Sequence, residues 1–316
     1  MHIDTAQQQS LVNMKEVIHE VAEALQAYSE GQTQNPIRYA LDFNQENRYL
    51  VMPALSDTLQ VAGVKVVSVV PHNTKQGKPA INGTVILTDY ETGETLATLD
   101  AAYLTKIRTG AISGVATKYF AKQDATTLSV IGTGAQAEGL IEAVLAVRPI
   151  KRLLLFNRTY EKAKWFAQNI EKQHPELEVT VFNDVNDVLE DTDIIVTATN
   201  ASDPVFEGAL KPGVHLNAVG SFKPEMQELP TTLISEADKV IVEAKDAALA
   251  ETGDLLKPIQ QGVFSAEALH GELGCVVSGA LPGREIEQEV TVFKSVGLAI
   301  VDIVVANYIY NKLIDQ

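Results

Sequence analysis

A glycine-containing motif follows directly after the apolar run 127–131 and precedes a helical pattern. It reads Gly132-Thr133-Gly134-Ala135-Gln136-Ala137, which has the form Gly-x-Gly-x-x-Ala. Between a strand and a helix, the first glycine allows a tight turn, the second lets the backbone approach a pyrophosphate, and the alanine permits close helix packing. The N-terminus of the helix also offers unpaired N–H groups and a positive dipole end to an anion. The motif therefore predicts a dinucleotide-binding βαβ unit, with a purely structural strand-to-helix turn as the alternative.

The segments after residue 123 alternate between β-rich runs and helical patterns. Expected strands are 127–131, 152–156, 178–182, 193–197, 214–219 and 239–243. Expected helices are 135–147, 161–172 and a short one at 185–189. This alternation, with strands that are almost entirely apolar, is typical of a parallel sheet covered by helices on both faces. The predicted fold class is therefore α/β, with a Rossmann domain over residues 123–292.

The flanking segments follow a different pattern. Residues 11–28 repeat apolar side chains at helical spacing, and Gly31 ends this predicted helix. Strands are expected at 38–43, 49–54, 61–70, 84–90 and 95–99, followed by a helix at 101–120. Residues 293–313 are interpreted as an apolar helix that packs back on the first part. Residues 1–122 and 293–316 are thus expected to form one split α+β domain, into which the Rossmann domain is inserted.

The end of the second Rossmann strand bears on the choice of cofactor. NAD-specific sites usually place an acidic residue there to bind the ribose 2′-hydroxyl group. In this chain the strand is followed by Asn157, Arg158 and Thr159, with Lys162 one helical turn further on. These four residues are expected to contact the cofactor, and Arg158 can pair with a 2′-phosphate. The pattern favours NADP(H), and NAD(H) is possible if Arg158 is only a solvated surface residue.

Three cations in the first domain stand in unusual surroundings. Lys65 lies inside an apolar strand, Arg38 begins a strand, and Arg108 lies in an apolar helix. A cation in an apolar run is costly unless it is paired. Such cations are suited to binding a substrate carboxylate, and arginine does so with two parallel contacts. The alternative is that each cation forms a structural ion pair or faces outward.

The composition argues against several classes of function. A net charge of −16 without a cluster of Lys or Arg disfavours a nucleic-acid partner. Apolar stretches such as 296–305, which contains Asp302, are too short to span a membrane. The single Cys275 and six scattered histidines predict no metal site, and the cysteine usage suits a cytoplasmic protein. His215, in an apolar strand, and Asp302, on an apolar helix, are interpreted as structural residues.

Several sequence blocks together resemble the ornithine cyclodeaminase and mu-crystallin family along nearly the whole chain. The blocks are Met52-Pro53, 65–71, 104–114 with Arg108-Thr109, 132–137, 197–199 and 290–297. The resemblance implies a split α+β domain for substrate binding and dimerisation, with the Rossmann domain inserted into it. It also implies a homodimer that acts on a small imino or amino acid.

The resemblance assigns roles to individual residues. Arg38, Lys65 and Arg108 match positions that hold the substrate carboxylate, and Met52 belongs to the same substrate-binding group. Lys65 and Arg108 are the expected catalytic residues, with Lys65 close to the reacting centre. Cofactor contacts are implied for Thr109, Thr197, Ala198, Thr199, Val219, Ser221, Ser295 and Gly297. Ser295 and Gly297 match residues close to the nicotinamide.

One departure from the family pattern bears on the reaction. Ornithine cyclodeaminases carry an Asp two residues after the glycine that matches Gly220, and this chain has Phe222 there. A phenyl ring cannot accept a proton or bind an ammonium group through a carboxylate. Glu225 or Glu228 could substitute only if the loop bends differently.

The departure favours a ketimine reductase. Its substrate would be Δ1-pyrroline-2-carboxylate or Δ1-piperideine-2-carboxylate, reduced to L-proline or L-pipecolate with hydride from NAD(P)H. Lys65 would steer or supply the proton, because burial lowers the pKa of a lysine. The alternatives are an ornithine cyclodeaminase that forms L-proline and ammonia, an amino-acid dehydrogenase such as alanine dehydrogenase, and an NADPH-binding protein with little catalysis.

Overall fold

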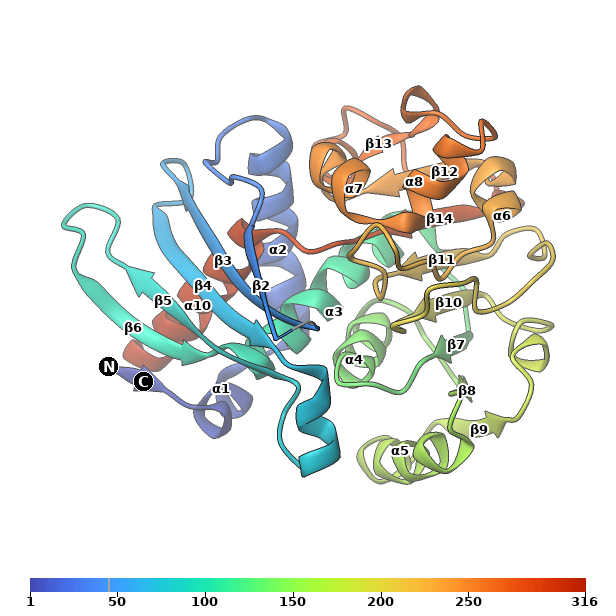
Figure 1. Ribbon diagram of the computed structural model, residues 1–316, viewed down its shortest axis with the longest axis horizontal. Helices are drawn as coiled ribbons and strands as arrows, with labels where there is room; N and C mark the ends of the chain where they lie inside the picture. Colours follow the sequence, from blue (N-terminus) through green and yellow to red (C-terminus); the bar gives the residue numbers. More distant parts are fainter. Residues whose placement is uncertain (45) are drawn as a thin grey trace. The chain divides into compact units, whose positions relative to one another are not determined.

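The computed structural model describes residues 1–44 and 46–316, which divide into two compact units (Figure 1). Unit 1 comprises Met1–Arg108 and Leu298–Gln316, and unit 2 comprises Thr109–Gly297. Unit 2 is therefore inserted into the sequence of unit 1. The division differs from the expected boundaries after residues 122 and 292, because one helix, α3 (Ala101–Phe120), continues through the first junction.

Unit 1 is built on a six-stranded sheet with the order β1-β6-β5-β4-β3-β2. Its strands are β1 (His2–Ile3), β2 (Tyr39–Phe43), β3 (Asn47–Ser56), β4 (Val61–Val69), β5 (Ile81–Thr88) and β6 (Thr95–Asp100). Neighbouring strands are antiparallel except for β1 and β6. The helices are α1 (Thr5–Leu11), α2 (Met14–Ser29), α10 (Ala299–Ile314) and the short 3-10 helix η1 (Pro71–Gln76).

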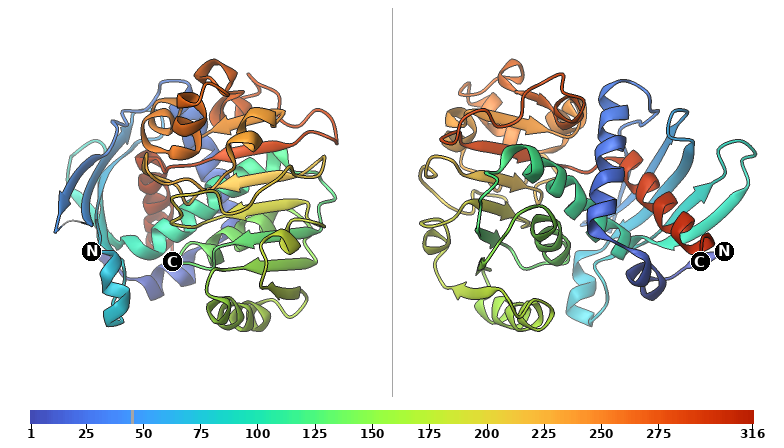
Figure 2. Two further views of the ribbon diagram at one scale, coloured as in Figure 1. Left: turned by 45° about the vertical axis from the view of Figure 1, so that its right-hand side comes forward. Right: turned by 180° about the vertical axis from the view of Figure 1, so that it is seen from behind.

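Helix α10 packs in the core of unit 1. It contacts α2 and strands β3, β4 and β5, and Figure 2 shows it in red beside the blue helix α2. Burial alternates along these strands, so that Leu50, Met52, Val85 and Leu87 face this core and their neighbours face away. The C-terminal helix thus completes a domain whose strands all come from the first hundred residues.

The predicted helix over 11–28 is wrong at its start. Leu11 ends α1, and α2 begins at Met14. Asn13 separates the two helices because its side chain accepts hydrogen bonds from the N–H groups of Lys15 and Glu16, which makes it the N-cap of α2. Gly31 ends this region with φ of 72°, as expected.

Unit 2 is built on an eight-stranded sheet with the order β13-β12-β14-β11-β10-β7-β8-β9, and every neighbouring pair is parallel. Its strands are β7 (Thr127–Ile131), β8 (Arg152–Phe156), β9 (Glu178–Phe182), β10 (Ile194–Thr197), β11 (His215–Ala218), β12 (Lys239–Val242), β13 (Gly271–Glu272) and β14 (Thr291–Lys294). The order β9-β8-β7-β10-β11 is that of a Rossmann fold, so the predicted α/β class is confirmed.

Helices cover both faces of the parallel sheet. They are α4 (Ala137–Val147), α5 (Tyr160–Gln173), α6 (Thr231–Glu236), α7 (Lys245–Glu251), α8 (Gly253–Gln260) and α9 (Leu273–Val277), with 3-10 helices η2 (Asn186–Val188) and η3 (Ala266–Ala268). Alternate residues of each strand enter two separate apolar cores. On β7, for example, Leu128 and Val130 face one core and Ile131 faces the other.

Residues 293–294 were expected to start the C-terminal helix, and the structure corrects this. They lie in β14, which pairs with both β11 and β12 in the middle of the sheet. A short apolar run cannot be assigned to strand or helix from periodicity alone. Among the described residues, no helix is long and apolar enough to cross a membrane.

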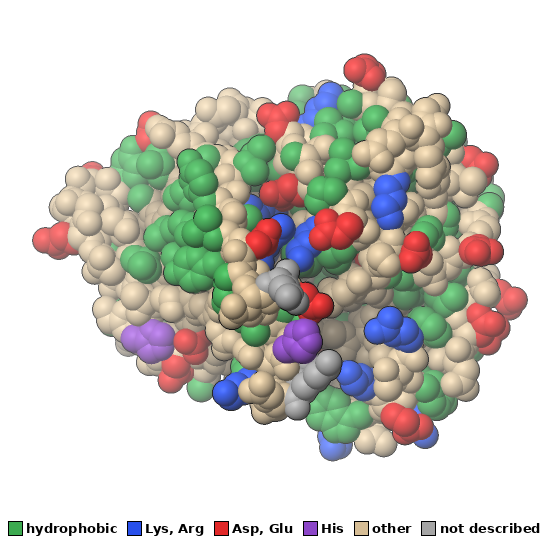
Figure 3. All heavy atoms as spheres, in the orientation of Figure 1, with side chains coloured by type: hydrophobic (Ala, Val, Ile, Leu, Met, Phe, Trp, Pro, Cys, Tyr) green, Lys and Arg blue, Asp and Glu red, His purple; other side chains and the backbone are tan. Residues whose placement is uncertain are grey.

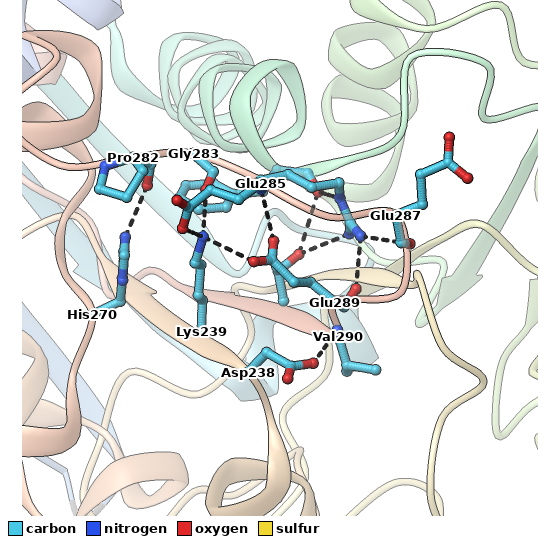
Figure 4. A network of polar contacts seen from close by, with 12 residues as sticks. Asp238, Lys239, His270, Pro282, Gly283, Glu285, Glu287, Glu289 and Val290 are labelled. Carbon is cyan, nitrogen blue, oxygen red and sulfur yellow. Dashed lines mark hydrogen bonds and ion pairs between the residues drawn. The ribbon is translucent and has the colours of Figure 1, made fainter.

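A network of ion pairs and hydrogen bonds ties the loop before β14 to the amino ends of the neighbouring strands. Lys239 Nζ lies 2.7 Å from a carboxylate oxygen of Glu285 and 3.0 Å from one of Glu289, and it donates to the carbonyl of Gly283 at 2.6 Å (Figure 4). Arg284 donates to the carbonyls of Phe120 and other residues nearby. Because the dinucleotide motif follows the carboxyl end of β7, this network supports the opposite edge of the sheet.

Candidate active site

Three charged side chains meet inside unit 1. Lys65 lies on β4, Arg108 on α3 and Asp302 on α10, and each is almost fully buried. Asp302 Oδ2 lies 2.6 Å from Lys65 Nζ, and Asp302 Oδ1 lies 3.0 Å from Arg108 Nε. When Lys65 is protonated, one carboxylate between two cations leaves a positive charge in excess, which suits an anionic ligand. The sequence interpretation of Asp302 as a structural residue gave no indication of its place between the two expected catalytic residues.

Burial changes the acid–base chemistry of Lys65. Removal from water lowers the pKa of its ammonium group from 10.5 to about 7. Asp302 opposes this shift, whereas the charges of Arg108 and Arg38 strengthen it. Lys65 is therefore present in both protonation states near neutral pH, as a proton donor or acceptor must be.

Met52 and Arg38 lie close to this group. Met52 on β3 is the register partner of Lys65 on β4, so the two side chains share one face of the sheet. Arg38 precedes β2, is half-buried, and is near enough for its charge to lower the pKa of Lys65. All four residues expected to bind substrate thus belong to one region of unit 1.

The glycine motif of unit 2 forms a tight turn with open space beside it. Gly132 has φ of 102°, and a Cβ atom there would lie 2.7 Å from the carbonyl oxygen of Ala198. A Cβ atom on Gly134 would meet nothing within 4 Å. Helix α4 begins at Ala137, later than expected, and its N-cap Gln136 makes no side-chain bond to the helix. The open backbone and the exposed helix N-terminus fit the pyrophosphate of a dinucleotide.

The loop after β8 is tied to this turn. Asn157 Oδ1 accepts a hydrogen bond from Thr133 N at 3.3 Å, and Asn157 Nδ2 donates to Thr159 O at 3.0 Å. Arg158 and Lys162 are exposed. The asparagine therefore fixes the loop, while both cations are accessible to a phosphate group.

The other residues expected to contact the cofactor lie at the carboxyl ends of neighbouring strands. Thr109, which lies on α3, is the exception. Thr197 ends β10, and Val219 follows β11 and donates from its N–H to Thr197 O at 2.9 Å. Ser295 follows β14 and donates from its N–H to Ala218 O at 3.0 Å. The strands β10, β11 and β14 are adjacent, so these loops share one edge of the sheet.

Two buried glutamates that the sequence analysis did not assign hold these loops. Glu228 accepts hydrogen bonds from backbone N–H groups in the loops 197–199 and 219–221. Glu243 Oε1 accepts from the N–H groups of residues 296 and 297, at 2.7 and 2.5 Å. Both side chains are fully buried. An acidic residue at the end of an apolar strand, such as Glu243 after β12, is the signal that could have indicated one of them.

The remaining candidates fall outside the site. His215 is fully buried, its Nδ1 lies 2.9 Å from Thr291 Oγ1, and burial lowers its pKa to about 3, so it is a neutral core residue. Glu225 is exposed, and the carboxylate of Glu228 is occupied by backbone N–H groups, so Glu228 does not replace the acid missing at Phe222. Within residues 1–44 and 46–316, no group of three or more His, Cys, Asp and Glu could hold a metal ion.

Comparison with known proteins identifies the family. The family model for the ornithine cyclodeaminase/mu-crystallin family matches residues 2–316, so this chain belongs to that family. Δ1-Pyrroline-2-carboxylate reductase of Bacillus cereus is 53% identical over 315 residues, which cover 99% of this chain and 97% of the relative. The ketimine reductase mu-crystallin of Rattus norvegicus is 33% identical over 285 residues, 90% of this chain and 86% of the relative.

Two solved structures share the complete fold. Δ1-Pyrroline-2-carboxylate reductase of Thermococcus litoralis, in complex with NADH and L-proline, has a TM-score of 0.96 and is 35% identical, covering 100% of this chain and 98% of its own. An archaeal alanine dehydrogenase dimer with bound NAD has a TM-score of 0.92 and is 31% identical, covering 100% of this chain and 96% of its own.

Replacing Asp302 tests the buried ion group. In Asp302→Asn, Lys65 and Arg108 lose their shared counter-ion and two cations stay buried, so the free energy of unfolding should fall by about 3–5 kcal/mol. Urea unfolding at pH 7 measures this change. The control Asp315→Asn alters an exposed carboxylate at the end of α10 and should change stability by less than about 0.5 kcal/mol. Equal stability of both variants would show that Asp302 is not the counter-ion.

Proposed function

We propose that this protein is an NAD(P)H-dependent reductase that converts Δ1-pyrroline-2-carboxylate or Δ1-piperideine-2-carboxylate to L-proline or L-pipecolate. The observation that carries the proposal is the buried group of Lys65, Asp302 and Arg108, which combines a net positive charge with a lysine whose pKa is lowered to about 7. The identity of 53% to reductases of the first substrate supports it. So does the similarity to a reductase structure that holds NADH and L-proline.

Each residue of the group has a distinct task in this reaction. Arg108 contacts Asp302 through Nε, and its terminal Nη nitrogens form the pair that binds a carboxylate in parallel. Arg38 assists in binding the carboxylate, and Met52 supplies an apolar contact beside Lys65. Lys65 delivers a proton to the imine nitrogen, which makes the adjacent carbon electrophilic. The reduced dinucleotide, when bound, supplies the hydride that this carbon receives.

The substrate assay tests this function together with the role of Lys65. NADPH and NADH absorbance should fall on addition of either cyclic imine, and kcat/KM should decrease as pH rises through about 7, because Lys65 then loses its proton. Lys65→Ala should lower kcat/KM by about 100-fold or more while cofactor affinity is retained. The exposed control Lys15→Ala should behave as the unaltered protein.

Other products would indicate the alternatives. L-Proline and ammonia formed from ornithine, without net consumption of cofactor, would establish a cyclodeaminase and show that Phe222 is no barrier. Cofactor oxidation that requires ammonia and a keto acid would indicate an amino-acid dehydrogenase. A pH profile that is flat between pH 6 and 9 would remove Lys65 as the proton donor.

We further propose that NADPH is the preferred cofactor and that NADH also binds. The support is the exposed pair Arg158 and Lys162 after β8, together with Asn157 in place of an acidic residue.

In Arg158→Ala, the dissociation constant for NADPH should rise roughly tenfold and that for NADH should stay unchanged, because only NADPH carries the 2′-phosphate. Fluorescence titration measures both constants. The control Arg152→Ala, which removes a cation paired with Asp191 at the other end of β8, should alter neither. Equal weakening of NADPH and NADH in Arg158→Ala would show that the 2′-phosphate lies elsewhere.

We also propose that the protein is a cytoplasmic homodimer whose partners are a second copy and its small-molecule substrate. The outer face of the sheet of unit 1 exposes large apolar side chains on β2 and β3: Tyr39 is 67% exposed, Leu41 65% and Tyr49 40%. Figure 3 shows apolar side chains gathered over this part of unit 1. A contiguous apolar face of this kind is typical of an interface. The similar alanine dehydrogenase is a dimer, and a single cysteine suits a reducing compartment.

The mass in solution tests the dimer. The unaltered protein should elute in light-scattering chromatography with the mass of two chains. Leu41→Glu should yield single chains at low micromolar concentration, because it places a charge in the apolar face. Ile286→Glu changes a side chain of unit 2 that is 59% exposed and should leave the dimer intact. A dimeric Leu41→Glu protein would place the interface elsewhere.

A further inference from the structure

The Glu228 carboxylate joins two loops of unit 2. Its Oε1 accepts a hydrogen bond from Thr199 N at 2.6 Å, and its Oε2 accepts from Gly220 N at 2.7 Å and Ser221 N at 3.1 Å. Thr199 follows β10, whereas Gly220 and Ser221 follow β11. One fully buried side chain therefore fixes the backbone after two adjacent parallel strands.

The loop after β10 also borders the dinucleotide turn. A Cβ atom at Gly132 would lie 2.7 Å from Ala198 O and 2.9 Å from Thr199 Cγ2. A Cβ atom at Gly220 would lie 2.2 Å from Thr199 O and 2.5 Å from Glu228 Oε1. Thr199 is thus enclosed between the turn on one side and the loop after β11 on the other, and Glu228 holds its N–H group.

The backbone at Glu228 is itself held in place by a second carboxylate, that of Asp254. Asp254 Oδ1 accepts from the N–H groups of Glu228 at 2.7 Å and Leu229 at 3.0 Å. Asp254 Oδ2 lies 2.9 Å from Lys294 Nζ, and both side chains are fully buried. Because Lys294 ends β14, the support of the two loops extends to a third strand.

The contacts of Glu228 favour its ionised form. All three backbone groups are donors, so a protonated acid or an amide would direct a donor of its own toward one of them. Burial raises the pKa of the Glu228 carboxyl group and the Asp254 charge raises it further, whereas the Lys294 charge and the hydrogen bond from Thr199 N lower it. The backbone N–H groups therefore hold a charge that burial alone would disfavour.

We propose that Glu228 is a positioning residue for the dinucleotide: its carboxylate holds the 197–199 loop against the Gly132 turn and so sets the shape of the cofactor site. Glu228 does not touch the imine and takes no part in proton transfer. The proposal rests on the proposed function only in that the dinucleotide binds at this edge of the sheet.

The isosteric variant Glu228→Gln tests the role. Its amide NH₂ group must face either Thr199 N or the pair Gly220 N and Ser221 N, so one loop loses its anchor. The dissociation constant for NADPH, measured by fluorescence titration, should rise roughly tenfold, because a bond to a charged acceptor is lost and a donor is left unpaired. The value of kcat at saturating cofactor and the KM for the imine should change by less than about threefold. Glu225→Gln alters an exposed carboxylate in the same segment and should bind NADPH as the unaltered protein does.

The outcomes separate this proposal from the function. Tight NADPH binding by Glu228→Gln would overturn the positioning role and leave the reductase intact. Failure of the unaltered protein to bind either dinucleotide would overturn the proposed function instead. Amide hydrogen exchange of the unaltered, cofactor-free protein gives a second reading that needs no variant. The N–H groups of Thr199, Gly220 and Ser221 should exchange slowly, and rapid exchange would show that Glu228 does not hold the loops.

Discussion

The charge balance around Asp302 governs what unit 1 can do. Lys65 and Arg108 would be costly to bury without it. With it, the group carries one net positive charge when Lys65 is protonated, and burial lowers the pKa of that lysine to about 7. Asp302 lies on α10, which returns from the end of the chain to pack on β3, β4 and β5. Helix α10 therefore contributes both a part of the core of unit 1 and the counter-ion of its buried cations.

Buried carboxylates serve two different purposes in the two units. Asp302 pairs with side chains, so its surroundings remain able to exchange a proton. Glu228 and Glu243 accept hydrogen bonds from backbone N–H groups, which never titrate in the physiological range, and so they fix geometry. One chemical group thus provides reactivity where it faces lysine and rigidity where it faces the main chain.

The sequence predicted the parts of the fold and site whose signals are local. Strands 127–131, 152–156 and 178–182 are as expected because each is a short run rich in residues that favour strands, and the glycine motif indicated where a dinucleotide fits. Lys65 and Arg108 stood out because a cation in an apolar run is rare. The pairing of Asp302 with Lys65 was not predicted, because the two residues are 237 positions apart in the sequence. Glu228 was weighed only as a substitute acid, because nothing local indicates which N–H groups a carboxylate meets.

The position of β14 determines when the molecule can acquire its shape during synthesis. This strand lies between β11 and β12, yet residues 291–294 are synthesised after both of them. Until then both neighbours have an unpaired edge in the middle of the sheet. The core of unit 1 is likewise incomplete until α10 has been synthesised. Domains usually form in order of synthesis. Here the inserted unit 2 can be completed once β14 has been made, before α10 is available to unit 1, so the unit that contains residues 1–108 is completed second.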